Sequence, residues 1–115
     1  MDPNCLFCKI VARKIPGKIA FENERVVAFE DIAPVAPTHV LLVPREHFAS
    51  TLEVDLSRHA VVGELVQVAA QLARERGFAA DGYRLVFNTN AGAGQTVFHL
   101  HLHLLGGRTF RWPPG

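Results

Sequence analysis

The stretch Val97-Phe98-His99-Leu100-His101-Leu102-His103-Leu104 alternates apolar and polar residues with a period of two. This period is typical of a strand that buries one face, so it predicts a strand from Val97 to Leu104 with Phe98, Leu100, Leu102 and Leu104 facing the core. The three histidines fall on the opposite face, about 6.6 to 6.8 Å apart along the strand. They are therefore close enough to engage one small ligand group or one metal ion together.

Three histidines within five residues indicate chemistry rather than an ordinary exposed face. Thr, Lys, Glu or Arg serve a solvated strand surface equally well, whereas histidine supplies a nucleophile, a proton carrier or a metal ligand near neutral pH. Spacing alone leaves two interpretations open. The triplet is either a cluster of neutral imidazoles that binds a catalytic metal with one position left for water, or a nucleophile with neighbouring acid and anion-binding groups.

Length, charge and hydropathy exclude several classes of protein. A chain of 115 residues predicts one domain, 1–115, and its near balance of charge, +1 in total, gives no basic field for nucleic acid. No apolar run approaches the roughly 20 residues that cross a bilayer, and the start Met-Asp-Pro-Asn-Cys lacks the basic and apolar regions of a signal peptide. We therefore expect a cytoplasmic protein that binds neither nucleic acid nor membrane.

Periodicity and turn residues predict the elements before the histidine stretch. They are a short helix from Leu6 to Val11, a hairpin of strands from Ile19 to Glu22 and from Val26 to Glu30, a strand from His39 to Pro44, a long helix from about Asp55 to Arg76, and a strand from Tyr83 to Phe87. The long helix carries an apolar face and has Gly77 placed to end it. That face consists of Val62, Leu65, Val66, Ala69, Leu72 and Ala73. Short connections favour antiparallel pairing, so the fold class is α+β, with about five strands and the long helix on one face of the sheet.

The segment Asn88 to Gln95 joins the last two predicted strands and is rich in small residues. Its glycines allow backbone N–H groups to approach an anion such as phosphate. Such a segment is more often a plain hairpin connection, and it lacks the Gly-Lys-Ser/Thr ending of a P-loop. Its position directly before the three histidines is what favours anion binding.

The remaining candidate ligands are two cysteines and three further histidines. Cys5 and Cys8 are either a pair of thiols at a chain end or, with His47 and one histidine of the triplet, a closed Cys2His2 zinc site. His59, near the start of the long helix, is expected to be exposed and without a role. His39 follows an irregular segment at the beginning of a strand, where a hydrogen-bonded core histidine is the commoner case.

With these residues in hand, the chain resembles the histidine triad (HIT) superfamily, and most closely its histidine triad nucleotide-binding (HINT) branch. The matching segments are Phe7 to Pro16, Phe29 to Ile32, Ala36 to His39, Tyr83-Arg84, Gly94 to Thr96, the triplet with Leu104-Leu105, Gly106-Gly107-Arg108, and Trp112 to Gly115. The resemblance implies an α+β fold with an antiparallel sheet and a homodimer that binds purine nucleoside monophosphates.

The resemblance also implies the activity of a purine nucleoside phosphoramidate hydrolase, for substrates such as adenosine 5'-phosphoramidate or AMP-lysine. His101 matches the nucleophile that attacks the α-phosphorus and forms a nucleotidyl-histidine intermediate. His103 matches the residue that contacts the phosphate and assists charge or proton movement, and His39 matches the histidine that supports the nucleophile. No cofactor is implied for catalysis.

Further residues match the family's binding positions. Asp31 matches the carboxylate that accepts hydrogen bonds from the ribose hydroxyls, and Asn88, Gly94, Gln95 and Thr96 match positions around the phosphate and the leaving group. The candidates for the base pocket, each of which core packing also explains, are Phe7, Ile10, Phe21, Phe29 and Leu41. Trp112 lies in a tail, 108–115, that reaches the partner's active site in relatives and shapes the leaving-group pocket.

Several bacterial members of the superfamily hold zinc between two cysteines, a mid-chain histidine and the first histidine of the triad. Cys5, Cys8, His47 and His99 match this set, and four protein ligands make such a zinc structural because no position is left for water. Alternatives to the phosphoramidase are a non-catalytic purine-nucleotide-binding or scaffold protein, a dinucleoside polyphosphate hydrolase, and a hydrolase that uses the triplet as its catalytic metal site.

Overall fold

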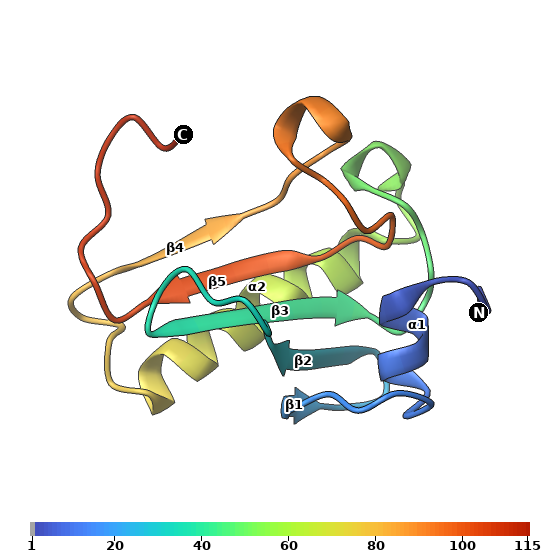
Figure 1. Ribbon diagram of the computed structural model, residues 1–115, viewed down its shortest axis with the longest axis horizontal. Helices are drawn as coiled ribbons and strands as arrows, with labels where there is room; N and C mark the ends of the chain where they lie inside the picture. Colours follow the sequence, from blue (N-terminus) through green and yellow to red (C-terminus); the bar gives the residue numbers. More distant parts are fainter. Residues whose placement is uncertain (1) are drawn as a thin grey trace.

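A computed structural model describes residues 2–115 as one antiparallel sheet with a helix on each face (Figure 1). The five strands lie in the order β1-β2-β3-β5-β4, and every neighbouring pair is antiparallel. The elements are α1 (Leu6–Val11), β1 (Ile19–Glu22), β2 (Val26–Glu30), β3 (Thr38–Pro44), the 3-10 turn η1 (Thr51–Glu53), α2 (His59–Glu75), β4 (Tyr83–Val86), the 3-10 turn η2 (Ala91–Ala93) and β5 (Leu102–Gly106). The predicted α+β class, strand number, short helix and long helix are confirmed. No helix within residues 2–115 is long and apolar enough to cross a membrane.

The sheet has a hydrophobic layer on each face, and the central strand β3 is buried throughout. Side chains alternate along a strand, so Val40 and Leu42 pack beneath α2 while Leu41 and Val43 pack beneath α1. The thicker layer lies under α2 and the thinner one under α1. The site described below is built at the thinner layer.

The predicted strand from Val97 to Leu104 is wrong in its first half, because β5 begins only at Leu102. Pairing with β3 ends at Leu42 opposite Leu102, and Pro44 lacks an N–H for any further ladder. The carbonyl of Pro44 accepts instead from His99 Nε2–H, 2.8 Å away. The chain before β5 therefore leaves the sheet, and Phe98 is 47% exposed rather than buried.

Two details of the long helix also differ from the expectation. It begins at His59 rather than Asp55, because the Asp55 side chain accepts from the N–H of Ser57 and closes a turn before the helix. Val66 is exposed and Val68 takes its place in the core, as the helical period requires once Leu65, Ala69 and their neighbours are buried. Gly77, with φ of +85°, ends the helix as predicted.

We expect Gly106→Ala to destabilise the fold by about 1 to 3 kcal/mol, because a methyl group there would overlap the ring of Phe78, which is packed in the core under α2. Gly63→Ala is the matched control, since no atom lies within 4 Å of its new methyl on the exposed side of α2. The control should gain up to about 1 kcal/mol of helix propensity. Urea unfolding of both variants measures the difference. Equal urea midpoints would show that the structure accommodates the methyl group at position 106 without loss of stability.

Candidate active site

A cavity of about 630 Å³ opens between α1, the 15–18 turn and the ends of β2, β3 and β5. Its walls are mainly apolar, and the rings of Phe7 and Phe29 meet edge to face with centroids 5.3 Å apart. Of the predicted site residues, the cavity brings together Phe7, Ile10, Phe29, Asp31, Leu41, Thr96, His101 and His103. A planar apolar group fits between such walls, with the histidines at one end.

Phe21 is not part of this cavity, and its assignment to the base pocket is wrong. The pairing of β1 with β2 is irregular between Ile19 and Phe21, as a β-bulge produces. Ile19 therefore packs beneath α1, whereas Phe21 turns to the opposite face and packs in the layer under α2.

His101 is held in a single tautomer by the backbone. Its Nδ1–H donates to the carbonyl oxygen of His99, 2.8 Å away, which leaves the lone pair on Nε2. Burial lowers the pKa of His101, so the ring is neutral at physiological pH. The ring also meets Phe7 edge to face, with centroids 4.9 Å apart. His101 is thus a neutral, fixed imidazole on the cavity wall with the lone pair free on Nε2, which is what a nucleophile requires.

His103 stands beside His101, with ring centroids 5.0 Å apart. Its Nδ1 lies 2.9 Å from His39 Nε2, and His39 Nε2 lies 3.3 Å from a carboxylate oxygen of Asp31. Burial, together with the neighbouring His101 and His39, lowers the pKa of His103 to about 4. His39 therefore contacts His103 and Asp31 rather than the ring of His101.

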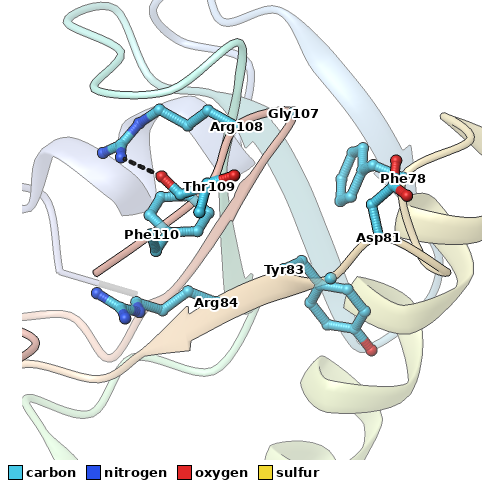
Figure 2. Close-up of a pocket in the computed structure, with 9 residues that line it drawn as sticks. Phe78, Asp81, Tyr83, Arg84, Gly107, Arg108, Thr109 and Phe110 are labelled. Carbon is cyan, nitrogen blue, oxygen red and sulfur yellow. Dashed lines mark hydrogen bonds between the residues drawn. The ribbon is translucent and has the colours of Figure 1, made fainter. Parts of the chain in front are cut away.

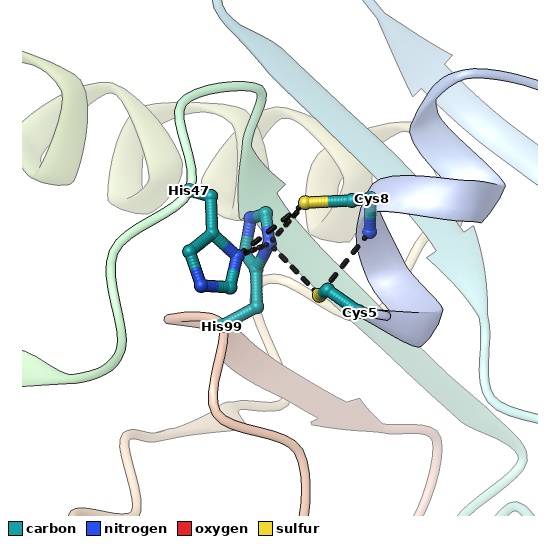
Figure 3. A group of neighbouring side chains, drawn as sticks. All are labelled: Cys5, Cys8, His47 and His99. Carbon is teal, nitrogen blue, oxygen red and sulfur yellow. Dashed lines mark hydrogen bonds between the residues drawn. The ribbon is translucent and has the colours of Figure 1, made fainter. Parts of the chain in front are cut away.

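The cysteines form a second cluster with His47 and His99 (Figure 3). The Nδ1 atom of His99 lies 3.5 Å from both sulfurs, Cys8 Sγ lies 3.4 Å from His47 Nδ1, and the two Nδ1 atoms are 3.2 Å apart. A tetrahedral zinc ion with bonds of about 2.3 Å to sulfur and about 2.0 Å to nitrogen separates its ligands by roughly 3.3 to 3.8 Å. The four residues fit zinc in donor type and in spacing.

Local structure aims these donors at one point. Cys5 caps the N-terminus of α1, and its sulfur accepts from the N–H of Cys8, 3.4 Å away, so one helical turn presents both sulfurs. His99 Nε2–H donates to Pro44, which leaves the lone pair on the Nδ1 that faces the sulfurs. Burial raises the pKa of the Cys5 thiol and lowers that of His99 to about 4. A bound cation would replace the thiol protons.

The three histidines of the triplet do not converge on one point, so the catalytic metal site that spacing left open is not formed. His99 faces the cysteines, while His103 joins Asp31 and His39. The irregular backbone before Leu102 separates His99 from the other two, which a regular strand would have kept on one face.

Three predicted phosphate-site residues, Asn88, Gly94 and Gln95, are not among the residues that line the cavity. Gln95 is 4% exposed, and its side chain bonds the N–H of Asn90 and the carbonyls of Ala49 and Val97. Gln95 therefore braces the loop so that Thr96 reaches the cavity. The residues from Ile15 to Lys18 form a further wall that was not predicted, because the only signal in the sequence was the turn-forming Pro16-Gly17 pair.

The tail after β5 runs beside β4 and away from this cavity (Figure 1). A second cavity of about 590 Å³ lies there, and Figure 2 shows Phe110 between the side chains of Arg84 and Arg108. The two guanidinium carbons are 5.2 and 4.3 Å from the ring centroid, and Arg84 also donates to the carbonyl of Arg111. Trp112 is 83% exposed and does not line the cavity that holds its own chain's His101.

The sequence profile of the HIT domain matches residues 12–110. The chain belongs to the HIT domain family. It is 44% identical over 108 residues to the purine nucleoside phosphoramidase of Escherichia coli K12, covering 94% of this chain and 91% of that protein. The crystal structure of a HIT family hydrolase from Legionella pneumophila superposes with a TM-score of 0.95 at 48% identity, covering 97% and 100% of the two chains. A histidine triad nucleotide-binding protein from Candida albicans gives 0.79 at 28% identity, covering 96% and 83%.

Proposed function

We propose that this HIT protein is a purine nucleoside phosphoramidase that works through a nucleotidyl-histidine intermediate. The observation that carries the proposal is His101, whose Nδ1–H is tied to the His99 carbonyl while Nε2 keeps its lone pair at the cavity wall. The activity named for the E. coli relative and the apolar walls, which suit a purine, support it. Asp31 also lines the cavity, and we assign to its carboxylate the hydrogen bonds from the ribose hydroxyls.

The chemistry follows from the tautomer of His101, in which Nδ1 carries the proton and Nε2 the lone pair. Nε2 of His101 attacks the α-phosphorus while the amine nitrogen takes a proton from water, so that the bond from phosphorus to nitrogen breaks and a neutral amine leaves. The imidazole of the intermediate then carries phosphorus on one nitrogen and a proton on the other, and the His99 carbonyl stabilises the resulting positive charge. Water then attacks the same phosphorus and gives up a proton to solvent, which balances the proton taken by the amine. The bond from Nε2 to phosphorus breaks, the nucleoside monophosphate is released and the lone pair returns to Nε2.

The intermediate itself is the direct test. We expect a rapid alkaline quench of an adenosine phosphoramidate reaction to leave one adenylyl group per active chain on the peptide that contains His101. His101→Ala should carry no adduct. Turnover without any adduct at the earliest times would contradict the covalent route, and nucleotide binding without turnover would favour the binding or scaffold protein instead. Faster cleavage of a dinucleoside polyphosphate than of the phosphoramidate would show that the protein is a dinucleoside polyphosphate hydrolase instead.

We also propose that zinc binds at Cys5, Cys8, His47 and His99 and has a structural role. The donor set and spacing support this, and four protein ligands leave no open position for a reacting water. Zinc supplies no step of the reaction here; it fixes the backbone two residues before His101. Thiolates that bind metal must stay reduced, which agrees with a location in the cytoplasm.

A homodimer is the assembly we propose, with the tail 108–115 of each protomer reaching the active site of the other. The open edge of the sheet at β4 supports this, as does the exposure of Trp112 beyond it. The leaving amine would then meet Trp112 of the second copy. Light scattering gives the assembly state, and a change in leaving-group preference in Trp112→Ala tests the contact.

A further inference from the structure

The segment between β2 and β3 places a backbone N–H against His39. Val35 N–H donates to His39 Nδ1 at 3.2 Å, so this nitrogen carries the lone pair and the proton of the neutral ring lies on Nε2. Val35 is 59% exposed, and its hydrogen bond to His39 comes from the backbone N–H rather than from the side chain.

The tautomer of His39 determines that of His103. His39 Nε2–H faces two acceptors, His103 Nδ1 at 2.9 Å and a carboxylate oxygen of Asp31 at 3.3 Å, and the contact with His103 is the shorter. His103 Nδ1 therefore accepts this proton, and the proton of the neutral His103 ring lies on Nε2. His103 Nε2 is buried and has no hydrogen-bond partner within residues 2–115. His103 lines the cavity beside His101, so a donor without a partner is held next to the nucleophile.

The two neighbouring rings are thus fixed in opposite tautomers by two different peptide groups. The His99 carbonyl gives His101 a lone pair on Nε2, and the Val35 N–H, acting through His39, gives His103 a proton on Nε2. A phosphoryl group needs both, one to attack phosphorus and one to donate to an oxygen. The other tautomer of His103 would turn a lone pair toward that oxygen and repel it.

We propose that the backbone N–H of Val35 is a positioning group for the reaction, because it sets the tautomers of His39 and His103 so that His103 donates to the phosphoryl group. This inference rests on the proposed function. Two contacts hold the segment on either side of this N–H: Arg108 Nε–H donates to the Val35 carbonyl at 3.2 Å, and Asp31 accepts from the N–H of Ala33 at 2.8 Å. Arg108 stacks on Phe110 as well, which ties the segment to the tail.

The test compares Val35→Pro, which removes the N–H, with Val35→Ala, which keeps it and changes only an exposed side chain. We expect Val35→Ala to behave as the wild type. Val35→Pro should lower kcat for the phosphoramidate by about tenfold, the ratio that one neutral hydrogen bond sustains between two tautomers. Its KM should change little, because the apolar walls are untouched.

Nitrogen-15 NMR of the histidine rings shows which nitrogen of each ring carries the proton. A purely structural role of Val35 would leave these tautomers unchanged in the proline variant. In the wild type, His39 and His103 should carry the proton on Nε2 and His101 on Nδ1. In Val35→Pro, His39 and His103 should become mixtures while His101 stays unchanged. A proton on Nδ1 of His103 in the wild type, or equal kcat in the two variants, would overturn the proposal, and the wild-type spectrum decides even if the proline variant does not fold. If the protein shows the assigned tautomers but has no phosphoramidase activity, the proposed function is refuted and the tautomer assignment stands.

Discussion

His101→Ala is expected to lower kcat/KM for an adenosine phosphoramidate by about 10⁴-fold or more, as removal of a covalent nucleophile does in other enzymes. No neighbouring group can replace it. His103 holds its Nδ1 against His39, and His99 faces the two cysteines. The affinity for a purine nucleoside monophosphate should fall much less, because the cavity walls around Phe7, Phe29 and Leu41 remain.

The measurement combines a fluorogenic phosphoramidate assay with calorimetric binding of AMP. His59→Ala is the matched control, since it removes an exposed imidazole at the start of α2. A His101→Ala enzyme within tenfold of the wild type would rule out His101 as the nucleophile. Loss of binding together with activity would mean that the substitution disturbs the cavity as a whole.

The sequence was sufficient for the parts of the fold in which periodicity acts alone. The helix Leu6–Val11 and the hairpin of β1 and β2 have the predicted bounds, because turn residues stand between them and end each element. The predicted strand was wrong where one hydrogen bond to a backbone group outweighs the alternating pattern of side chains. The histidine stretch alternates perfectly, yet a proline carbonyl takes a side-chain hydrogen bond and the first half of the stretch leaves the sheet. A bulge likewise moved Phe21 to the other face.

For the site, residue types were visible in the sequence and their protonation was not. Family resemblance grouped Cys5, Cys8, His47 and His99, and these four side chains do lie together. It matched His39 to a supporting role for the nucleophile, but in the structure His39 contacts His103 rather than His101. Tautomers depend on which backbone groups lie within hydrogen-bond reach, and these groups come from Val35, His99 and Pro44. Backbone groups are common to every residue, so no sequence pattern identifies them.

Cys8→Ser is expected to abolish stoichiometric zinc binding and to lower the melting temperature of the full chain by more than about 10 °C. Cys8 is 1% exposed, and the cluster joins positions as far as 94 residues apart, so the ion would close long loops as well as bind α1 to the strand edge. Losing several kcal/mol from a domain of this size corresponds to such a shift. Zinc content by mass spectrometry and calorimetric melting measure the two effects.

Asp2→Asn provides a graded comparison within the same cluster. The Asp2 carboxylate lies 3.8 Å from Nε2 of His47, on the side away from the sulfurs, so it would orient a ligand without being one. We expect this variant to keep one zinc per chain with an affinity about tenfold lower. If zinc has the structural role proposed, activity in Cys8→Ser and in chelated protein should fall only in parallel with the folded fraction. If the metal-free protein melts at the same temperature, zinc does not stabilise the fold. If the chelated protein stays folded but loses turnover, zinc takes part in the catalytic step.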